Sequence, residues 1–599
     1  MNLLTRNNPD VAFAPHEKFF LETWHAMTHE LFLDSYRVRC LNARTIIREL
    51  DQELRIGRAS PEAFQELCAE ADEILARDPQ VPQSFVRHLG LLQPLLKNPP
   101  LLDEKKRDAA LEQKHREFRF TVSDFSAALE RDYFRQLLAA LPDTIAGGNN
   151  DQIYVTVGAL LSDLVDQGWP LESLFDWIEL FFQKKPLAHH ATFSANLLFL
   201  MRQLDRGKQP FRAILRLSGS SRLATFGDFA GFQFRSLPGF TPLPGPQQKF
   251  AVAYSLVAFA ETQIDAVDFL SAAIAARERF EMCLDQMRFN FEPSPLNVDQ
   301  RCFVERGDKR TELVTVRHLV PNPRHHLAPE AFREFTDQME SMLKRENVEA
   351  ETAERLRAAV RHYRFGSDAD SYKDKFLNWW MGLEFLTHVT QGEMIGRTVA
   401  RHVSDALLQR YLYRLVWVLV HTLQNQAIPW PGELATESEA ATLTELKALG
   451  ALKLLRSQPH AEKLAQSFPD NPVAGFHIGR LAATLQDPKK TADLIVAHHR
   501  HLIWQLGRLY RIRCCIVHGS PIRFKLPLLT ANLEFYLRES ILVCLRSLSL
   551  NEHVTSLREV FQRAAVTRQR VDSELRDNNV SPDAIRRAVF NAVVIQETQ

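Results

Sequence analysis

The sequence predicts a mainly α-helical protein, with a helical bundle in its C-terminal part, a helical N-terminal region and an α+β middle region with small β-hairpins. Apolar residues recur at helical spacing over most of the 599 residues, whereas strand-like runs are confined to the middle of the chain. Turn-forming residues at 147–150 and the prolines at 321, 323 and 329 separate this middle part from the helical parts. Because the chain is too long for one hydrophobic core, we expect about two to four domains.

The predicted organisation follows these boundaries. It comprises an N-terminal helical region at 1–146, an α+β region at 151–328, a helical domain at 329–550 and a C-terminal helical tail at 551–599. The middle region shows no recognisable active site and precedes the C-terminal domain. We therefore interpret it as a sensor or a scaffold.

In the N-terminal region, large apolar side chains at helical spacing, including Phe19, Trp24 and Met27, predict the first helix. Further helices are expected at about 61–77, 81–96 and 103–140. No histidine in this region pairs with another ligand at a spacing that suits a metal ion. The region therefore offers a helical core without a catalytic constellation.

Two hairpins are expected in the middle region. The strand-like runs 211–217 and 229–234 flank Ser218-Gly219-Ser220-Ser221, and no Gly-Lys-Ser/Thr follows these small residues, so a turn is expected there rather than a phosphate loop. The runs 301–305 and 312–316 predict a second hairpin. Between them, the alanine-rich stretch 250–289 predicts a long helix.

The C-terminal part predicts an antiparallel helical bundle. Helices at about 329–345 and 347–364 lead into main helices at 371–389, 394–427, 491–517 and 526–549, with a helical pair at 443–455 inserted between the second and the third. The charged segment 551–599 is again helical in pattern and is expected to form a docking arm.

The end of the helix expected at 491–517 carries the most plausible chemistry. Arg513 and His518 lie five positions apart, and Gly519 and Pro521 then stop the helix, so that His518 falls in the last turn. Arg511 and Cys514 share a helical face with His518. Guanidinium groups suit a phosphate, and an imidazole can transfer a proton. The spacing alone is weak evidence, because Arg357–His362 and Arg397–His402 repeat it.

Two stretches resemble a known family. Leu509-Tyr510-Arg511-Ile512-Arg513, followed by Ile516-Val517-His518-Gly519, is similar to the signature of Apea-like HEPN domains, which are associated with abortive infection in prokaryotes. Asp374-Lys375-Phe376-Leu377-Asn378-Trp379-Trp380-Met381-Gly382-Leu383-Glu384-Phe385-Leu386 resembles the opening helix of these domains. The resemblance covers about a third of the chain, within 329–550. One residue departs from the pattern, because Cys514 stands where the family usually has asparagine or another polar residue.

This resemblance implies an endoribonuclease that acts as a toxin or anti-phage effector, with catalytic Arg513 and His518 from two chains in one composite site. Arg511, Cys514 and Glu384 are expected to support the site, Glu384 as a buried partner of a motif arginine. Homodimerisation, RNA as substrate, partner proteins of a defence system and chemistry without a metal or cofactor are expected. The alternative is a non-catalytic HEPN module that binds RNA or a partner protein, and a structural ion pair is the alternative for Glu384.

Charge and composition bound these expectations. Lys plus Arg and Asp plus Glu both number 73, so RNA must be bound by a local basic patch. One run without an acidic residue is a candidate, with a solvated helix face as the alternative; it contains His498, His499, Arg500, His501, Arg508, Arg511, Arg513, Arg523 and Lys525.

The composition also bounds the compartment. The seven cysteines lack the spacing of a zinc site or a disulfide framework, which is typical of a reducing environment. The longest apolar run, 412–423, is too short for a bilayer, and the N-terminus lacks the layout of a signal peptide. We therefore expect a soluble, cytoplasmic protein without membrane contact.

Overall fold

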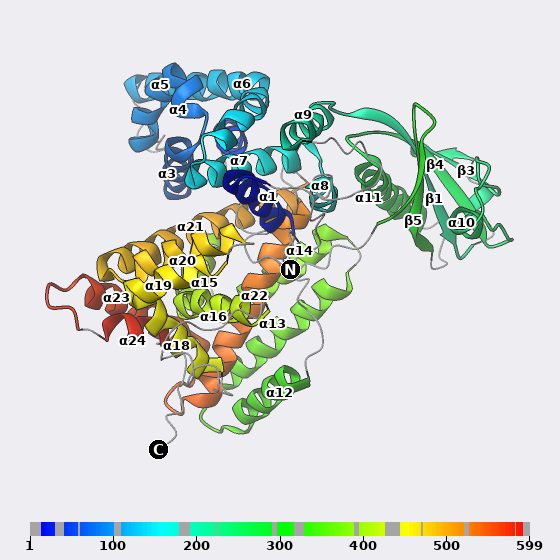
Figure 1. The fold of residues 1–599 in the computed structure, drawn as a ribbon. Helices are drawn as coiled ribbons and strands as arrows, with labels where there is room; N and C mark the ends of the chain where they lie inside the picture. Colours follow the sequence, from blue (N-terminus) through cyan, green and yellow to red (C-terminus); the bar gives the residue numbers. More distant parts are fainter. Residues whose placement is uncertain are drawn as a thin grey trace. The chain divides into compact units, whose positions relative to one another are not determined.

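The computed structural model describes residues 13–29, 41–57, 60–100, 109–178, 192–220, 222–225, 227–289, 296–316, 329–369, 371–387, 394–425, 444–468, 471–519, 526–581 and 583–590. The chain is mainly helical, as expected (Figure 1). Its described strands form one six-stranded sheet rather than separate small hairpins. The chain divides into two compact units. The first comprises residues 1–27, 31–159 and 321–599, and the second comprises 28–30 and 160–320.

The second unit is built on the antiparallel sheet. Two helices precede it, α8 (Leu171–Ile178) and α9 (Phe193–Leu204). The strands are β1 (Gln209–Ser218), β2 (Asp228–Phe229), β3 (Phe232–Arg235), β4 (Val257–Ala266), β5 (Asn297–Arg306) and β6 (Thr311–Thr315), in the order β2-β3-β4-β1-β5-β6. Helix α11 (Phe269–Arg288) packs on one face, where its small residues Ala272, Ala273 and Ala276 let its backbone approach the buried strand side chains.

One prediction for this unit is wrong. The alanine-rich stretch 250–289 is not one helix, because only α10 (Pro246–Phe250) and α11 are helical and β4 lies between them. Strand β4 pairs with β1 on one side and with β3 on the other. Pairing on both edges and burial of Phe259 and Ala260 outweigh the helix propensity of alanine.

The two predicted hairpins have different outcomes. Strands β5 and β6 form the expected pair at 301–305 and 311–315. The run 229–234 does not pair with 211–217. It folds back on itself through Ala230 and Gly231, which have φ angles of 49° and 78°, and β3 then pairs with β4. The neighbours of β1 are therefore β4 and β5, which are distant in sequence.

The first unit begins with a series of helices, and the residues of the last of them, α7, are divided between the two units. Its helices are α1 (Pro15–Thr28), α2 (Ala43–Ile56), α3 (Pro61–Arg77), α4 (Val81–Ser84), α5 (Val86–Lys97), α6 (Ala109–Ala146) and α7 (Asn150–Gln167). Helix α2 starts at a capping box formed by Asn42 and Thr45 and ends at Gly57, which has a φ of 66°. These local signals fix the ends of the helix that carries Glu49.

The C-terminal helices complete the first unit. They are α12 (Pro329–Lys344), α13 (Ala350–Asp368), α14 (Tyr372–Thr387), α15 (Ile395–Leu408), α16 (Tyr411–Asn425), α18 (Thr444–Arg456), α19 (Gln458–Gln466), α20 (Pro472–Leu485), α21 (Pro488–Val517), α22 (Leu526–Leu550), α23 (Leu557–Arg576) and α24 (Ala584–Phe590). One hydrophobic core contains Trp379, Leu509 and Leu537, and another contains Val416, Ile478 and Val589. Helix α21 contributes to both cores and therefore links them.

Three differences from the sequence-based expectations concern this part. The helix expected at 394–427 is two helices, α15 and α16, which separate after Leu408. The insert expected as a helical pair at 443–455 instead has α18, α19 and α20. The segment 551–599, expected as a separate docking arm, supplies Phe561 and Val589 to the two cores through α23 and α24. Its charged residues are the outer faces of amphipathic helices.

None of the described helices combines the length and the apolar character that crossing a membrane requires.

Candidate functional site

The end of α21 has the geometry that its sequence predicts. Helix α21 begins at Asp487, whose carboxylate accepts hydrogen bonds from the amides of Lys489 and Lys490, and its last residue is Val517. Gly519 follows with a φ of 64°, which is the left-handed conformation that ends many helices. His518 donates its backbone N–H to Cys514 O at 3.0 Å and lies exposed. The imidazole is thus accessible from solvent.

Arg513 contacts the second stretch that resembles the family. Its Nη2 atom lies 3.7 Å from Oε1 of Glu384 on α14, and both side chains are about a quarter exposed. The indole Nε1 of Trp380 donates a 2.6 Å hydrogen bond to the same carboxylate oxygen. Glu384 is therefore a partner of a motif arginine, as expected, but its carboxylate lies at the surface of the bundle rather than inside it.

Tyr510 packs beneath this pair. Its ring lies 5.7 Å from that of Trp380, and it approaches Gly396 so closely that a Cβ there would lie 2.4 Å from the tyrosine ring. Burial and the neighbouring Cys514 thiol raise the pKa of Tyr510. Cys514 thus contacts a tyrosine that supports the site. The supporting roles of Trp380 and Tyr510 were not predicted, although the spacing of Trp380 and Glu384, four residues apart on a helix, could have indicated the first.

Arg511 points to a different part of the chain. It donates a hydrogen bond to Glu49 on α2. Arg508, one turn earlier and fully buried, donates to Glu49 at 2.8 Å through Nε and to Glu70 on α3 at 2.5 Å through Nη2. We call these four residues the buried ion cluster. Arg511 and Arg513, expected to act together, therefore have separate carboxylate partners.

The two carboxylates of this cluster, Glu49 and Glu70, have pKa values shifted in opposite directions. Burial raises the pKa of Glu49, but the charges of Arg508 and Arg511 outweigh this effect, and the pKa is lowered overall. Burial is the larger effect at Glu70, so its pKa is raised despite the contact with Arg508. Two arginines share the Glu49 carboxylate, so Glu49 holds its negative charge more strongly than Glu70 does.

The described part of the basic run, 498–519, has most of its cations in contact with other side chains. Arg500 and His501 both contact Glu73 of α3, with His501 Nε2 lying 2.8 Å from the carboxylate. His499 lies 3.2 Å from Asp405 on α15. His498 stacks on Tyr411 with ring centroids 3.7 Å apart.

Most of the described side chains of this run therefore have an acidic or aromatic partner, and RNA binding by the run stays a prediction. The run has no acid of its own, but α2, α3, α14 and α15 supply acids to it. Arg523 and Lys525 lie outside the described residues. Of the site residues expected from the sequence, the structure brings together Arg513, Cys514 and Glu384, with His518 at the end of the same helix, and directs Arg511 away from them.

A pair with the same spacing as Arg513 and His518 differs from it. His362 stacks on Phe385 at 5.2 Å, and its Nδ1 atom lies 3.2 Å from Asn378 Oδ1, whereas Arg357 pairs with Glu354. This histidine on α13 is therefore held by side chains of the neighbouring helix α14. Within the described residues, no group of three or more His, Cys, Asp and Glu side chains is arranged to hold a metal ion.

In comparisons with protein-family models, curated proteins and solved structures, nothing matches this chain.

Proposed function

We propose that this chain is a metal-independent endoribonuclease of the HEPN class, acting in the cytoplasm as a toxin or anti-phage effector in abortive infection. The observation that carries the proposal is the end of α21, where His518 is exposed and Arg513 is held by Glu384. The resemblance of both stretches to Apea-like HEPN domains supplies the reaction class.

The proposed reaction uses only groups of the protein and the RNA. The ribose 2′-hydroxyl attacks the adjacent phosphorus, a bond from O2′ to phosphorus forms, and the bond from phosphorus to the 5′-oxygen breaks. His518 accepts the proton of the 2′-hydroxyl, or donates one to the 5′-oxygen, which contributes roughly 10²–10⁴-fold. Because the reaction needs the 2′-hydroxyl, DNA is not cleaved.

Arg513 stabilises the negative charge that develops on the phosphate oxygens. Its contact with Glu384 is loose at 3.7 Å, while Trp380 fixes the carboxylate at 2.6 Å. The carboxylate therefore orients the guanidinium without occupying all its donors, and the remaining N–H groups are free to bind a phosphate.

The reaction needs both an acid and a base, and one imidazole cannot serve as both at once. A second copy of the chain supplies the other histidine, as the family resemblance implies. Exposed apolar side chains close to Glu384 support self-association there. Phe365, Met381 and Phe385 on α13 and α14 are each 36–41% exposed. Apolar side chains of this size favour an interface over water.

The test compares purified wild-type protein with His518→Ala and Arg513→Ala on total RNA in EDTA, with the product ends mapped. We expect wild type to leave 2′,3′-cyclic phosphate ends and the His518→Ala variant to lose roughly 10²–10⁴-fold in rate. His553→Ala, an exposed histidine in the same compact unit, is the control and should cleave like wild type. Intact RNA with folded wild-type protein would exclude the nuclease.

A second candidate is a non-catalytic HEPN module that binds RNA or a protein of a defence system. The engagement of the α21 cations by Glu49, Glu70 and Glu73 favours its protein-binding form, because these contacts neutralise charge that RNA binding would need. Cys514 in place of the family's polar residue also favours it. This candidate predicts binding of RNA or of a protein without cleavage, in the same assay.

A further inference from the structure

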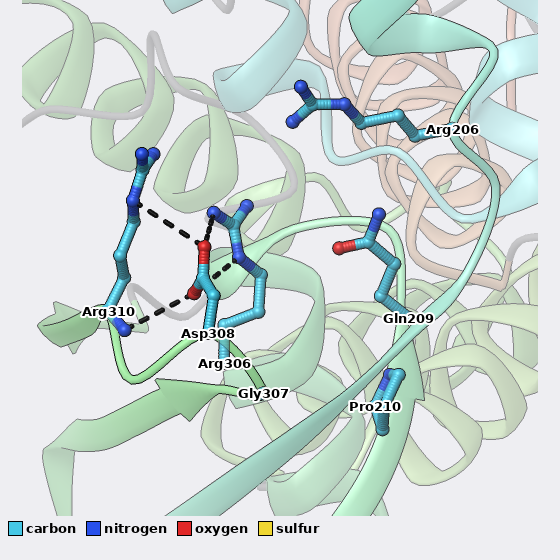
Figure 2. A pocket seen from close by; sticks show the side chains of 7 residues that line it. All are labelled: Arg206, Gln209, Pro210, Arg306, Gly307, Asp308 and Arg310. Carbon is cyan, nitrogen blue, oxygen red and sulfur yellow. Dashed lines mark hydrogen bonds and ion pairs between the residues drawn. The ribbon is translucent and has the colours of Figure 1, made fainter.

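A basic cleft lies in the second compact unit, apart from the end of α21. It has a volume of about 390 Å³ and is lined by Arg206, Gln209, Arg306, Gly307, Asp308 and Arg310. Figure 2 shows Arg206 and Gln209 on one side, across from Arg306, Asp308 and Arg310. We call it the arginine cleft. No part of the proposed nuclease reaction uses it.

The sheet register explains why these residues meet. Phe211 at the start of β1 lies opposite Arg306 at the end of β5, so Gln209 and the segment before it continue alongside the β5–β6 turn. That turn is closed by backbone hydrogen bonds from Arg306 N to Arg310 O at 2.9 Å and from Lys309 N to Arg306 O at 2.8 Å. Lys309 accordingly has a φ of 64°. Regular structure therefore fixes one side of the cleft.

The charges of the cleft do not balance. Asp308 accepts hydrogen bonds from Arg306 Nε at 3.0 Å and from the Arg310 amide at 3.2 Å, and the Arg310 Nε atom lies 3.5 Å away. The bond from Arg306 lowers the pKa of Asp308 to about 2, so the carboxylate is charged at neutral pH. Three guanidinium groups thus face one carboxylate.

The other side of the cleft carries unused donors. Within the part of the chain that the structure describes, no hydrogen bond or ion pair engages the side chains of Arg206 or Gln209. Arg306 and Arg310 are oriented by Asp308, whereas Arg206 and the Gln209 amide lie across from them (Figure 2). This combination of fixed and available donors suits an anion with several oxygens.

We propose that the arginine cleft binds the phosphate groups of a nucleotide or of a nucleic-acid backbone. Planar guanidinium groups match phosphate oxygens, and three of them converge on a space as large as a small-molecule site. Arg206 and Arg310 contact the phosphate, and Asp308 is a positioning residue for Arg306 and Arg310. The α+β region, which the sequence predicts only as a sensor or scaffold, would thereby have a binding site for phosphate.

The experiment uses the full chain with His518→Ala, so that an RNA probe stays intact whether or not the nuclease proposal holds. Binding of inorganic pyrophosphate and of ATP is measured by calorimetry, and binding of short labelled single-stranded RNA and DNA by fluorescence anisotropy. We expect saturable binding that weakens by about tenfold in Arg206→Ala and in Arg310→Ala. Each lost phosphate contact should lower the salt slope of oligonucleotide binding by about 0.7.

Arg235→Ala is the matched control, because Arg235 is an exposed arginine on β3 of the same sheet and does not line the cleft. It should bind within about twofold of the parent protein. Cleft-dependent binding of pyrophosphate or ATP would identify a free nucleotide, and cleft-dependent binding of oligonucleotides alone would identify a nucleic-acid backbone. Either supports the proposal. No saturable binding of any probe, or equal binding by the cleft variants and their parent, would overturn it.

Discussion

At the scale of single residues, the carboxylate partner of each arginine on α21 decides what that arginine can do. Arg508 is enclosed by Glu49 and Glu70, and Arg511 is drawn to Glu49, so neither guanidinium is available to a substrate. Among the described residues, Arg513 has the loose contact with Glu384 as its one ion pair, and it is partly exposed. Of these three arginines, Arg513 is therefore the one that the proposed function uses, with Glu384 setting its orientation.

The role of Glu384 is tested by Glu384→Ala and Glu384→Gln. Glu384→Ala removes the acceptor of Trp380 and the anchor of Arg513, so we expect kcat on RNA to fall by about tenfold, with a smaller change in KM. Glu384→Gln keeps an oxygen for Trp380 and should recover part of the loss. Glu552→Ala, at an exposed position, is the control. Equal rates for wild type and Glu384→Ala would refute an orienting role.

Asp405 should make the stability of the fold depend on pH. Its carboxylate is 1% exposed and lies 3.2 Å from His499 and 2.6 Å from Arg568. Burial raises the pKa of Asp405, but hydrogen bonds from His499 and Arg568 outweigh burial and lower it. The unfolded chain therefore takes up the proton first as pH falls.

The stabilisation from Asp405 is accordingly complete above the ordinary carboxyl pKa of about 4 and is lost below it. Asp405→Asn should lower the free energy of unfolding by about 2 kcal/mol at neutral pH and flatten its decline in acid. Urea titrations between neutral and acidic pH measure both effects. If the free energy of unfolding of Asp405→Asn declined in acid as steeply as that of wild type, other carboxylates would be responsible for the decline.

At the scale of elements, α2 and α3 are attached to α21 along several of its turns. Glu73 contacts Arg500 and His501, while Glu70 and Glu49 contact Arg508 and Arg511 further along the helix. The first group of contacts is partly exposed, and the second is buried. Their contributions to stability should therefore differ.

Glu70→Ala should destabilise the first compact unit by about 3–5 kcal/mol, because it leaves the buried charge of Arg508 with one partner fewer. Glu73→Ala breaks a more exposed pair and should cost at most about 1 kcal/mol. Chemical denaturation followed by tryptophan fluorescence measures the difference. Similar losses for both variants would contradict the distinction between buried and exposed contacts.

What the sequence could predict at this scale depends on whether the signal is local. Gly519 ends α21 and the β5–β6 pair forms as expected, because a glycine cap and a strand–turn–strand pattern are written in adjacent residues. Strand β4 was missed because Ala258 and Ala260 favour helices in isolation and become strand residues only by pairing with β1 and β3.

The site follows the same rule. The positions of Arg513 and His518 at one helix end could be predicted, because helix periodicity and a cap determine them. The capture of Arg508 and Arg511 by Glu49 could not be predicted, because the partners are 459 and 462 positions apart. A run of basic residues in a sequence therefore shows where positive charges lie along the chain. Only the folded structure shows which of them are paired with carboxylates and which can contact a ligand.

At the scale of the whole molecule, the two compact units carry different proposed chemistry. The first has the end of α21, and the second has the arginine cleft. The proposed nuclease is also incomplete in one chain, so its activity should depend on association of two copies.

Phe385→Glu tests this dependence. Phe385 is exposed next to Glu384, and a charge there should oppose burial in an interface between copies. We expect wild type to be a dimer by light scattering and Phe385→Glu to be largely monomeric, with RNA cleavage lost in parallel. Phe120→Glu is the control, because Phe120 on α6 is more exposed than Phe385, at 73% against 36%. A wild-type monomer that cleaves RNA would refute the composite site.

The pairing of Glu70 with Arg508, 438 positions later, also bears on how the protein is made. During synthesis α2 and α3 leave the ribosome long before α21, so their buried acidic side chains have no partners until most of the polypeptide has been translated. A truncated product that begins after residue 328 would have the reverse defect, because Arg508 would lack both Glu49 and Glu70. Translation as far as α21 is therefore a condition for pairing the charges of Glu49 and Glu70.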